Sequence, residues 1–376
     1  MTQKEYNIGV LTPPIESAGI IPLSNLIEIL KILSSNLYLI TGGNSFKHFK
    51  KDTNIFTYEI KFSKGKTIIM RILKYIYFNI DEASKILKFL NGIDCLMFFF
   101  SAEFQLIPIL TAKLFRKKTI IIMTGSSIKT LEAKNDMMRH GLVVLRFFTL
   151  LCADKIVLYS NKLVEEFGLN KWEKKIIIAH EHFLDFNNFT VTNPLSNRPH
   201  LIGYIGRLSE EKGVKQFIKA LPTILKDNQN LHAFIGGDGE LKGAIETSLQ
   251  EEKITDRVDL IGWISHDDLP KYLNQLRLLV IPSYTEGLPN IMLEAMACGT
   301  PVIATPVGAI PDIIIDGKTG FIMEDNSPEC IAKNVIRALN SQKMQQIAKN
   351  GREVVEENFT FEKTVKDWKL ILQNIE

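Results

Sequence analysis

Short apolar segments that alternate with longer amphipathic segments restrict the fold of this chain more than any other feature. In the first half the apolar segments are Asn7–Leu11, Tyr38–Thr41, Ile55–Ile60, Cys95–Phe100, Thr119–Met123, Lys155–Tyr159 and Lys175–Ala179. Their continuous hydrophobicity is typical of parallel strands that are covered on both faces. Helical patterns such as Leu23–Leu33 and Glu82–Leu90 lie between them. The first half therefore consists of βαβ units.

A polar segment divides this pattern into two series. Residues 187–199 read NNFTVTNPLSNRP, and we interpret them as a linker because they contain two prolines and no hydrophobic period. A second series begins at His200, with helices predicted at Val214–Leu225 and Asn290–Cys298. Its apolar segments are residues 200–206, 231–237, 257–263, 276–283, 300–305 and 320–323. Because 376 residues are many for one hydrophobic core, we predict an α/β protein with two Rossmann-like, doubly wound domains that face a central cleft.

The predicted boundaries are residues 1–190 for the first domain and 198–358 for the second, with residues 359–376 as a C-terminal helix that returns towards the first domain. In doubly wound sheets, ligands bind outside the carboxyl ends of the strands. We therefore expect the functional residues in the loops that follow the strands.

The charges are distributed unevenly between the two halves. Residues 1–197 carry 25 Lys and Arg against 17 Asp and Glu, whereas the remainder carries 20 against 25. The first half is thus the better candidate for an anionic partner such as a membrane surface, although a solvated basic face explains the charge equally well. We expect no nucleic-acid partner.

The cysteines and the N-terminus bear on the compartment. Cys95, Cys152, Cys298 and Cys330 form no C-x-x-C pair, which favours buried thiols in a reducing compartment. The first residues do not resemble a secretory signal, and the apolar run 141–152 is too short to span a bilayer. We expect a cytoplasmic protein, with peripheral contact at the cytoplasmic membrane face as an alternative.

Two cations follow the first strand of the second series. Arg207 comes directly after the strand that ends at Gly206, and Lys212 precedes Gly213 and a new helix. Glycines let a backbone approach a ligand closely, and a helix N-terminus presents free N–H groups to anions. This spacing suits the binding of a diphosphate, but two surface cations in a βα loop would give the same pattern.

A glycine loop and a helix form a more specific motif at residues 283–301, SYTEGLPNIMLEAMACGTP. Pro289 marks the start of the helix and Gly299 its end. Glu286 lies in the loop and Glu294 in the helix, and carboxylates accept hydrogen bonds from vicinal sugar hydroxyls. A solvated Glu294 would be unusual in so apolar a helix.

These two motifs, G-R-x4-K-G and E-x7-E, resemble those of the retaining GT-B glycosyltransferases of the large family 4 type, also called glycosyl transferases group 1. The resemblance is specific over residues 200–325 and looser over residues 1–197. It implies a diphosphate bound by Arg207 and Lys212, Glu294 on the ribose, and Glu286 near the donor sugar. It also implies Glu286, Arg207 and Lys212 as catalytic residues. The implied donor contacts are, in chain order, Gly19, Gly206, Arg207, Lys212, Gly237, Gly239, Glu286, Gly287, Leu288, Asn290 and Glu294.

The first half departs from the family pattern at three places. The first βα loop has one glycine, Gly19, where the family often has two. Thr124-Gly125 stands in place of a His-Gly pair, so that Thr124 either replaces a histidine contact to the donor sugar or leaves that role unfilled. Residues 180–183, HEHF, replace the usual Asn-Gly before the linker.

We expect neither a metal nor a cofactor. The chain has no D-x-D triplet, and the two histidines of residues 180–183 lack an apparent third ligand. The turn Gly237-Asp238-Gly239 lacks the third glycine of a dinucleotide fingerprint. The resemblance implies that Arg207, Lys212 and a helix N-terminus take over the charge of a metal ion.

Residues 64–80 combine cations with isoleucines. If the segment is helical, Ile68, Ile69, Ile72, Ile76 and Ile80 share one face, and Lys64, Lys66, Arg71 and Lys74 supply positive charge. The pattern is typical of a helix on an anionic membrane, or of a buried helix whose cations reach the solvent, and we favour the buried helix. Residues 142–151 are predicted to belong to the core.

The sequence therefore predicts a metal-independent retaining hexosyltransferase. Its donor would be a nucleotide-diphosphate sugar, and its acceptor a hydroxyl of a glycan or a lipid-linked molecule. Two alternatives remain: a sugar-nucleotide epimerase of GT-B shape, and a catalytically silent subunit that binds a nucleotide sugar.

Overall fold

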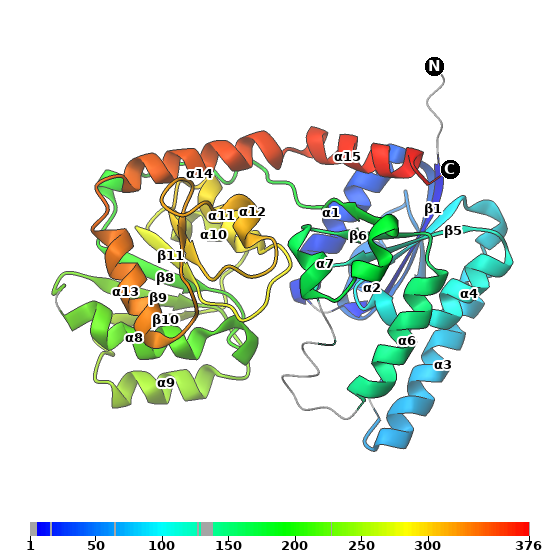
Figure 1. Cartoon of the computed structure of the whole chain (residues 1–376), viewed down its shortest axis with the longest axis horizontal. Helices are drawn as coiled ribbons and strands as arrows, with labels where there is room; N and C mark the ends of the chain where they lie inside the picture. Colours follow the sequence, from blue (N-terminus) through cyan, green and yellow to red (C-terminus); the bar gives the residue numbers. More distant parts are fainter. Residues whose placement is uncertain are drawn as a thin grey trace. The chain divides into compact units, whose positions relative to one another are not determined.

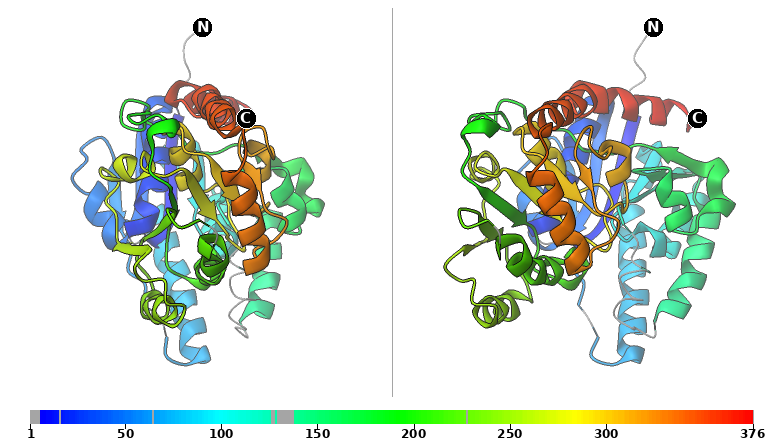
Figure 2. Two further views of the ribbon diagram at one scale, coloured as in Figure 1. Left: turned by 90° about the vertical axis from the view of Figure 1, so that its left-hand side faces the viewer. Right: turned by 60° about the vertical axis from the view of Figure 1, so that its left-hand side comes forward.

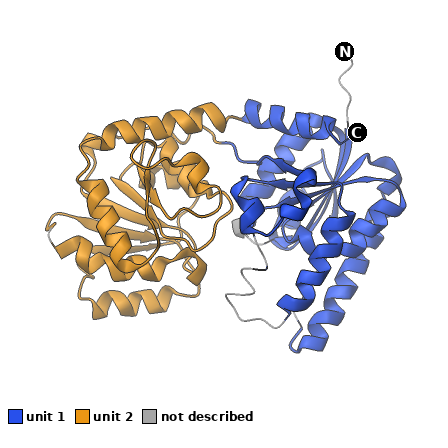
Figure 3. Ribbon diagram, in the orientation of Figure 1, with its two compact units in different colours: residues 1–183, 361–376 blue, residues 184–360 orange. Residues whose placement is uncertain are grey.

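The computed structural model describes residues 6–15, 17–63, 65–125, 128, 138–226 and 228–375. The chain divides into two compact units (Figure 3). Unit 1 comprises residues 1–183 and 361–376, and unit 2 comprises residues 184–360. The C-terminal segment thus returns to the first unit.

The described part of unit 1 contains a seven-stranded parallel sheet in the order β3-β2-β1-β4-β5-β6-β7. The strands are β1 (Tyr6–Ile15), β2 (Ser34–Gly42), β3 (Phe56–Glu59), β4 (Cys95–Phe99), β5 (Lys118–Met123), β6 (Lys155–Leu158) and β7 (Ile176–Ile178). Each contains or overlaps an apolar segment of the sequence. The strand order reverses between β1 and β4, where Ile8 lies opposite Cys95.

Helices cover both faces of this sheet (Figure 1). They are α1 (Ser17–Leu33), α2 (Gly43–Phe49), α3 (Ile68–Ile86), η1 (Leu90–Gly92), η2 (Ala102–Phe104), α4 (Leu106–Leu114), α6 (Arg139–Cys152), α7 (Lys162–Glu166), η3 (Asn170–Lys175) and α15 (Phe361–Gln373). Helix α1 packs against α15, and both share a core with alternate strand residues such as Val10 and Met97. Right-handed crossovers from β3 to β4 and from β4 to β5 place α3 and α4 on the opposite face.

The described part of unit 2 contains a six-stranded parallel sheet in the order β10-β9-β8-β11-β12-β13. The strands are β8 (Leu201–Ile205), β9 (His232–Gly236), β10 (Val258–Gly262), β11 (Leu278–Ile281), β12 (Val302–Ala304) and β13 (Phe321–Ile322). All six predicted strands of the second series are present. The strand order reverses between β8 and β11, where Leu279 lies opposite Gly203.

Two groups of helices cover the sheet of unit 2. They are η4 (Leu195–Asn197), η5 (Glu210–Lys212), α8 (Val214–Lys226), α9 (Lys242–Glu251), α10 (Leu269–Leu273), α11 (Asn290–Ala297), α12 (Ile310–Ile313), α13 (Pro328–Leu339) and α14 (Met344–Asn358). Helices α8 and α13 pack together in one core, and α11 packs against α10 and α14. The start of α8 at Val214 and of α11 at Asn290 agrees with the sequence-based prediction.

The predicted linker, residues 187–199, lies within unit 2. The buried guanidinium of Arg198 donates hydrogen bonds to the carbonyls of Leu276 and Cys298, at 2.9 and 2.7 Å, and to the hydroxyl of Thr300 at 2.7 Å. Burial lowers the pKa of Arg198 to about 10. A cation that satisfies three groups of the domain fixes this polar segment to unit 2, which composition alone does not reveal.

Three local predictions for unit 1 were wrong. Gly19 lies in the first turn of α1 rather than in a loop, because β1 runs to Ile15. The helix predicted at Glu82–Leu90 begins at Ile68 and ends at Ile86. Residues 142–151 are not core: only Thr149 and Leu150 of this segment are buried. In the described ranges, no helix is both long enough and apolar enough to cross a bilayer.

Candidate functional site

The two sequence motifs meet at the reversal point of the sheet in unit 2. The first motif follows β8 and the second follows β11, and these strands are hydrogen-bonded neighbours. Because the strands are parallel, both loops emerge at the carboxyl edge of the sheet. Such a reversal point is where open α/β sheets bind ligands.

The loop after β8 turns sharply before α8. Gly213 has φ of +68°, and a Cβ atom there would lie 1.9 Å from the carbonyl oxygen of Pro282. Glycine is therefore required where this loop passes over the end of β11. The Tyr204 hydroxyl donates a hydrogen bond of 2.7 Å to the carbonyl of Arg207, which fixes the backbone at the cation. The Arg207 side chain itself is 58% exposed and lies 3.4 Å from Glu211 Oε1.

Lys212 and Glu286 join the two motifs. Lys212 Nζ lies 2.8 Å from both Glu286 Oε1 and Oε2. The Ser283 hydroxyl donates a further hydrogen bond of 2.7 Å to Glu286 Oε1. Glu286 is buried, so both partners are needed to stabilise its charge away from water. The pair holds an ammonium and a carboxylate at one place at the sheet edge.

Glycine turns let the loops approach one another closely. A Cβ atom at Gly237, where φ is +135°, would lie 1.9 Å from the carbonyl oxygen of Gly206. A Cβ atom at Gly239 would lie 2.4 Å from the carbonyl oxygen of Leu208. The Leu208 N–H in turn donates a hydrogen bond of 2.9 Å to the carbonyl of Asp238. The loops after β8 and β9 are thus in backbone contact, which accounts for both predicted glycines.

The loop that leads into α11 is held from the β12 side. The Ala309 N–H donates a hydrogen bond of 2.8 Å to the carbonyl of Gly287. A Cβ atom at Gly308 would lie 2.3 Å from the carbonyl oxygen of Glu286. Leu288 is buried, and α11 begins at Asn290. The N-terminus of α11 is therefore fixed at the sheet edge, where its dipole favours anions.

Glu294 pairs with a histidine that the sequence analysis did not identify. Glu294 Oε1 lies 3.0 Å from Nε2 of His266, in the loop between β10 and α10. Glu294 is buried, so the alternative of a solvated helix residue is wrong, whereas the His266 side chain is 42% exposed. The hydrogen bond to Glu294 raises the pKa of His266. Nothing in the spacing of the residues marks this contact, which depends on how α10 and α11 pack.

The remaining predicted residues belong to unit 1. Gly19 lies after β1 and Thr124 directly after β5, both towards the carboxyl edge of the first sheet. In the segment 180–183, Glu181 accepts a hydrogen bond of 2.5 Å from the Tyr159 hydroxyl. Within the described ranges, no three His, Cys, Asp or Glu side chains are grouped so that they could hold a metal ion.

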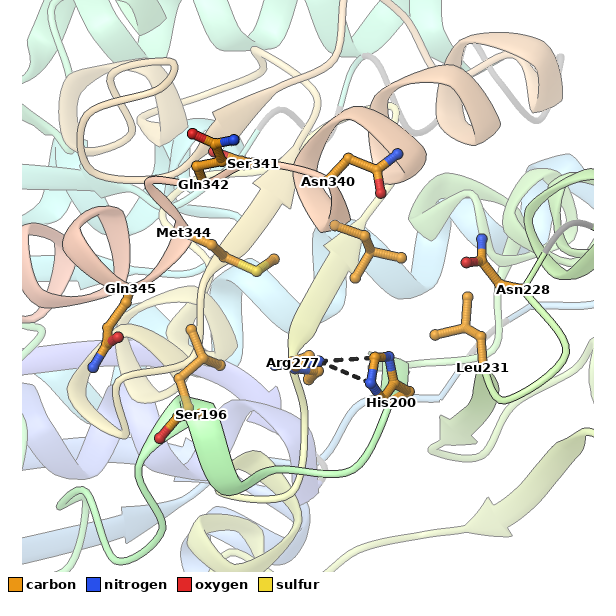
Figure 4. Close-up of a pocket in the computed structure, with 12 residues that line it drawn as sticks. Ser196, His200, Asn228, Leu231, Arg277, Asn340, Ser341, Gln342, Met344 and Gln345 are labelled. Carbon is orange, nitrogen blue, oxygen red and sulfur yellow. Dashed lines mark hydrogen bonds between the residues drawn. The ribbon is translucent and has the colours of Figure 1, made fainter.

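A pocket of about 310 Å³ in unit 2 contains none of the predicted residues (Figure 4). His200, Leu231 and Arg277 line it, and each directly precedes a strand. The pocket therefore lies at the amino edge of the sheet, opposite the two motifs. Its Arg277 contacts the His200 ring at 3.2 Å.

Residues 185–354 match the family model described as Glycosyl transferases group 1. The matched range contains both motifs and closely follows unit 2.

Several curated proteins are similar in sequence. An uncharacterized glycosyltransferase of Methanocaldococcus jannaschii, MJ1607, is 29% identical over 53% of this chain and 50% of its own length. The capsular polysaccharide biosynthesis glycosyltransferase CapM of Staphylococcus aureus is 27% identical over 61% of this chain and 64% of its own length. The chain thus spans between half and two thirds of these two relatives. The N-acetyl-alpha-D-glucosaminyl L-malate synthase of Bacillus anthracis is 23% identical over 99% of this chain and 97% of its own length.

Solved structures show the fold. Anabaena Alr3699/HepE in complex with UDP has a TM-score of 0.78 at 15% identity, covering 98% of this chain and all of its own. Sucrose-phosphate synthase from Thermosynechococcus elongatus has a TM-score of 0.74 at 19% identity, covering 98% of this chain and 99% of its own. The chain has the GT-B fold, with two Rossmann-like parallel-sheet units, as the sequence predicted.

Proposed function

We propose that this protein transfers a hexose from a nucleotide-diphosphate sugar to an acceptor hydroxyl and retains the anomeric configuration. The observation that carries the proposal is the convergence of Lys212 and Glu286, from two separate motifs, at the reversal point of the unit 2 sheet. The match of residues 185–354 to the glycosyltransferase family supports it.

The diphosphate would bind Arg207, Lys212 and the N-terminus of α11. Arg207 is exposed and its guanidinium can pair with two phosphate oxygens, whereas Lys212 supplies a point charge. The backbone N–H groups around Gly287, Leu288 and Asn290 would add hydrogen bonds, since a helix N-terminus favours anions. These groups would hold the donor without a metal ion.

The two glutamates would bind the two sugars of the donor. We assign Glu294 to the ribose hydroxyls, which would replace its hydrogen bond to His266. We assign Glu286 to the hydroxyls of the transferred hexose. Lys212 balances its charge and Ser283 donates a hydrogen bond to it, so it can accept hydrogen bonds from a sugar without remaining an unpaired buried carboxylate.

The charges at this edge suit departure of a nucleoside diphosphate. As the bond from the anomeric carbon to the phosphate oxygen breaks, negative charge grows on the diphosphate and positive charge on the sugar ring. Arg207, Lys212 and the α11 N-terminus would stabilise the diphosphate with groups that are already in place. The acceptor hydroxyl would attack from the same face and transfer its proton to the departing phosphate oxygen, which gives retention.

HepE is described as bound to UDP and, in another crystal, to UDP-glucose, and we propose the same class of donor for this chain. The test is to incubate the protein with radiolabelled UDP-, GDP- and ADP-sugars and to separate the products. Transfer to an acceptor, or slow hydrolysis to the α-anomer, supports the proposal. Formation of an epimer would identify an epimerase, and binding without turnover would identify a silent subunit.

A further inference from the structure

Helix α3 exposes a long apolar face to the solvent. Eight of its large hydrophobic side chains are each more than 40% exposed: Ile68, Ile69, Met70, Ile72, Leu73, Ile76, Tyr77 and Ile80. Leu73 is 61% and Ile69 67% exposed. The sequence-based preference for a buried apolar face was therefore wrong. Lys64, which the same prediction included, lies outside the described residues.

Two polar side chains of α3 lie on its inner face. Asn79 and Glu82 are buried, and Gln105 Nε2 donates a hydrogen bond of 3.0 Å to Glu82 Oε1. The Asn79 amide donates to the carbonyl of Tyr75 at 3.2 Å. A surface helix that faces water has the opposite arrangement, with its polar side outward. The inner side of α3 thus combines Asn79 and Glu82 with the buried Phe78, Ala83 and Ile86, while its larger apolar face lies outside.

Helices α4 and α6 extend the apolar surface. Helix α4 contacts both α3 and α6. In α6 the side chains of Val143, Val144, Phe147, Phe148 and Leu151 are between 44% and 56% exposed. Leu110, Leu114 and Phe115 of the α4 region are exposed as well. We call the exposed apolar side chains of α3, α4 and α6 the apolar surface, and it exceeds the scattered hydrophobic residues that are normal on a monomer.

The ends of the two long helices are free of the sheet. The N-terminal parts of α3 and α6 extend beyond the strands of unit 1 in the same direction (Figures 1 and 2). Each follows the carboxyl end of a strand, β3 for α3 and β5 for α6. A flat partner could therefore contact both helices without meeting the sheet.

The charges around the apolar surface are mostly positive. No Asp or Glu occurs in residues 65–80, 106–118 or 139–152, and Asp81, further along α3, pairs with Lys85. These ranges contain the basic residues Lys66, Arg71, Lys74, Lys113, Arg116, Lys117, Lys118, Arg139 and Arg146. Lys113 pairs with Asp154 and Arg146 with Glu103. The side chains of Lys66, Arg116 and Lys118 are exposed. A second copy of the same surface would meet this positive charge with its own.

We propose that the apolar surface of unit 1 binds an anionic lipid bilayer. The hydrophobic side chains of α3 and α6 would enter the boundary between head groups and acyl chains, and the flanking cations would pair with anionic head groups. The proposal goes beyond sugar transfer and does not depend on it, because no residue assigned to the donor belongs to these helices. It places the protein at the surface where lipid-linked acceptors occur.

The test is co-sedimentation of the full chain with phosphatidylcholine vesicles that contain or lack phosphatidylglycerol, at low and at high salt. The apolar variant is Ile69→Gln/Leu73→Gln/Ile76→Gln, and the charge variant is Arg71→Ser/Lys74→Ser. The apolar control is Ile32→Gln/Ile315→Gln/Leu370→Gln, whose wild-type side chains are 50–58% exposed elsewhere on the chain. The charge control is Lys219→Ser/Lys242→Ser, two exposed lysines of unit 2.

We expect the wild type to bind the phosphatidylglycerol vesicles at low salt and to be released by salt, because salt screens the attraction. The partition coefficient should fall at least tenfold in the apolar variant and about fivefold for each cation removed, whereas both controls should bind like the wild type. Unchanged melting temperatures would show that the variants are folded.

Three outcomes would overturn the proposal. The first is a wild type that ignores phosphatidylglycerol vesicles at low salt. The second is equal binding to both vesicle types, insensitive to the charge variant. The third is a wild-type dimer in sedimentation velocity that the apolar variant converts to a monomer, without vesicle binding, since the apolar surface would then be a contact between two copies. Calorimetric donor binding in the same variants keeps this test separate from that of the proposed function.

Discussion

Lys212 Nζ lies 2.8 Å from both carboxylate oxygens of Glu286, 74 residues further along the chain. The two residues belong to different motifs, and only the pairing of β8 with β11 brings them together. A diphosphate at Lys212 would share this cation with Glu286. Its arrival would therefore loosen one of the two contacts of the carboxylate and leave it available to the hydroxyls of the donor sugar.

The two cations should differ in their effect on stability but not in their effect on donor binding. Lys212→Ala and Arg207→Ala should each weaken binding of the nucleoside diphosphate by about 1.5–3 kcal/mol, the contribution of a hydrogen bond to a charged group. Only Lys212→Ala should also lower the melting temperature, because it leaves the buried Glu286 without its cation. Calorimetry with UDP and thermal melting measure the two effects. Lys215→Ala, whose wild-type side chain pairs with Glu210, is the matched control, and unchanged UDP affinity in both variants would refute the assignment.

Substitutions of the two glutamates should have different effects. Glu294→Gln should weaken binding of the free nucleotide and of the sugar nucleotide alike, since the ribose is common to both. Glu286→Gln should reduce turnover while the affinity for the free nucleotide stays close to that of the wild type. Calorimetry and initial rates on both variants separate these effects. If Glu294→Gln instead discriminates between the two ligands and Glu286→Gln does not, the assignments are reversed.

Sequence reasoning predicted the local backbone of the candidate site because its glycines and its helix ends meet local backbone requirements. Gly213, Gly237 and Gly239 stand where backbone segments approach within contact distance, and a βα loop at such a place has few alternatives. Pro289 and Gly299 mark the two ends of α11 for similar reasons. The strands could be predicted because they are apolar on both faces.

Long-range side-chain contacts could not be predicted in the same way. The contact of His266 with Glu294 depends on the packing of α10 against α11, which no spacing encodes. The apolar face of α3 was predicted to be buried, and this was wrong. Hydrophobicity alone does not show which side of a helix faces the sheet. On that side of α3, Glu82 pairs with Gln105 beside the buried Phe78 and Ile86.

The contact between His266 and Glu294 predicts a pH dependence of nucleotide binding. The hydrogen bond raises the pKa of His266, so the protonated ring holds Glu294 below that pKa and releases it as the pH rises through it. Affinity for UDP should therefore increase with pH across this range. His266→Ala should remove the trend and bind better than the wild type at the acid end. Calorimetry over the range shows the effect, and parallel pH profiles for the two proteins would contradict it.

The glycine turn after β9 should tolerate no side chain. Gly237→Ala would place Cβ 1.9 Å from the carbonyl oxygen of Gly206 in a backbone with φ of +135°. We expect a loss of several degrees in melting temperature together with weaker UDP binding, because the loop after β8 must move. Gly243→Ala is the control: this residue lies in α9 with nothing within 4 Å of the new Cβ, and alanine there should stabilise by roughly 0.5–1 kcal/mol. Equal melting temperatures for both variants would contradict the steric argument.

The buried Glu181 should make unit 1 less stable as the pH rises. Burial raises the pKa of Glu181 from 4.5 to about 7, although the hydrogen bond from the Tyr159 hydroxyl lowers it. A carboxyl whose pKa is raised on folding binds more protons in the folded state, so the free energy of unfolding falls as the pH rises from about 4.5 to about 7 and then levels off. The shift corresponds to a loss of unfolding free energy on the order of 3 kcal/mol.

The variant Glu181→Gln keeps an oxygen that accepts the hydrogen bond of the Tyr159 hydroxyl but cannot ionise. It should therefore be more stable than the wild type at pH 7 and similar to it near pH 4.5. Burial lowers the pKa of the neighbouring His180 to about 4, and this group titrates in both proteins, so the difference between them isolates Glu181. Urea unfolding at a series of pH values measures this difference, with the exposed Glu173→Gln as the control. A constant difference between wild type and Glu181→Gln over this range would show that folding does not raise the pKa of Glu181.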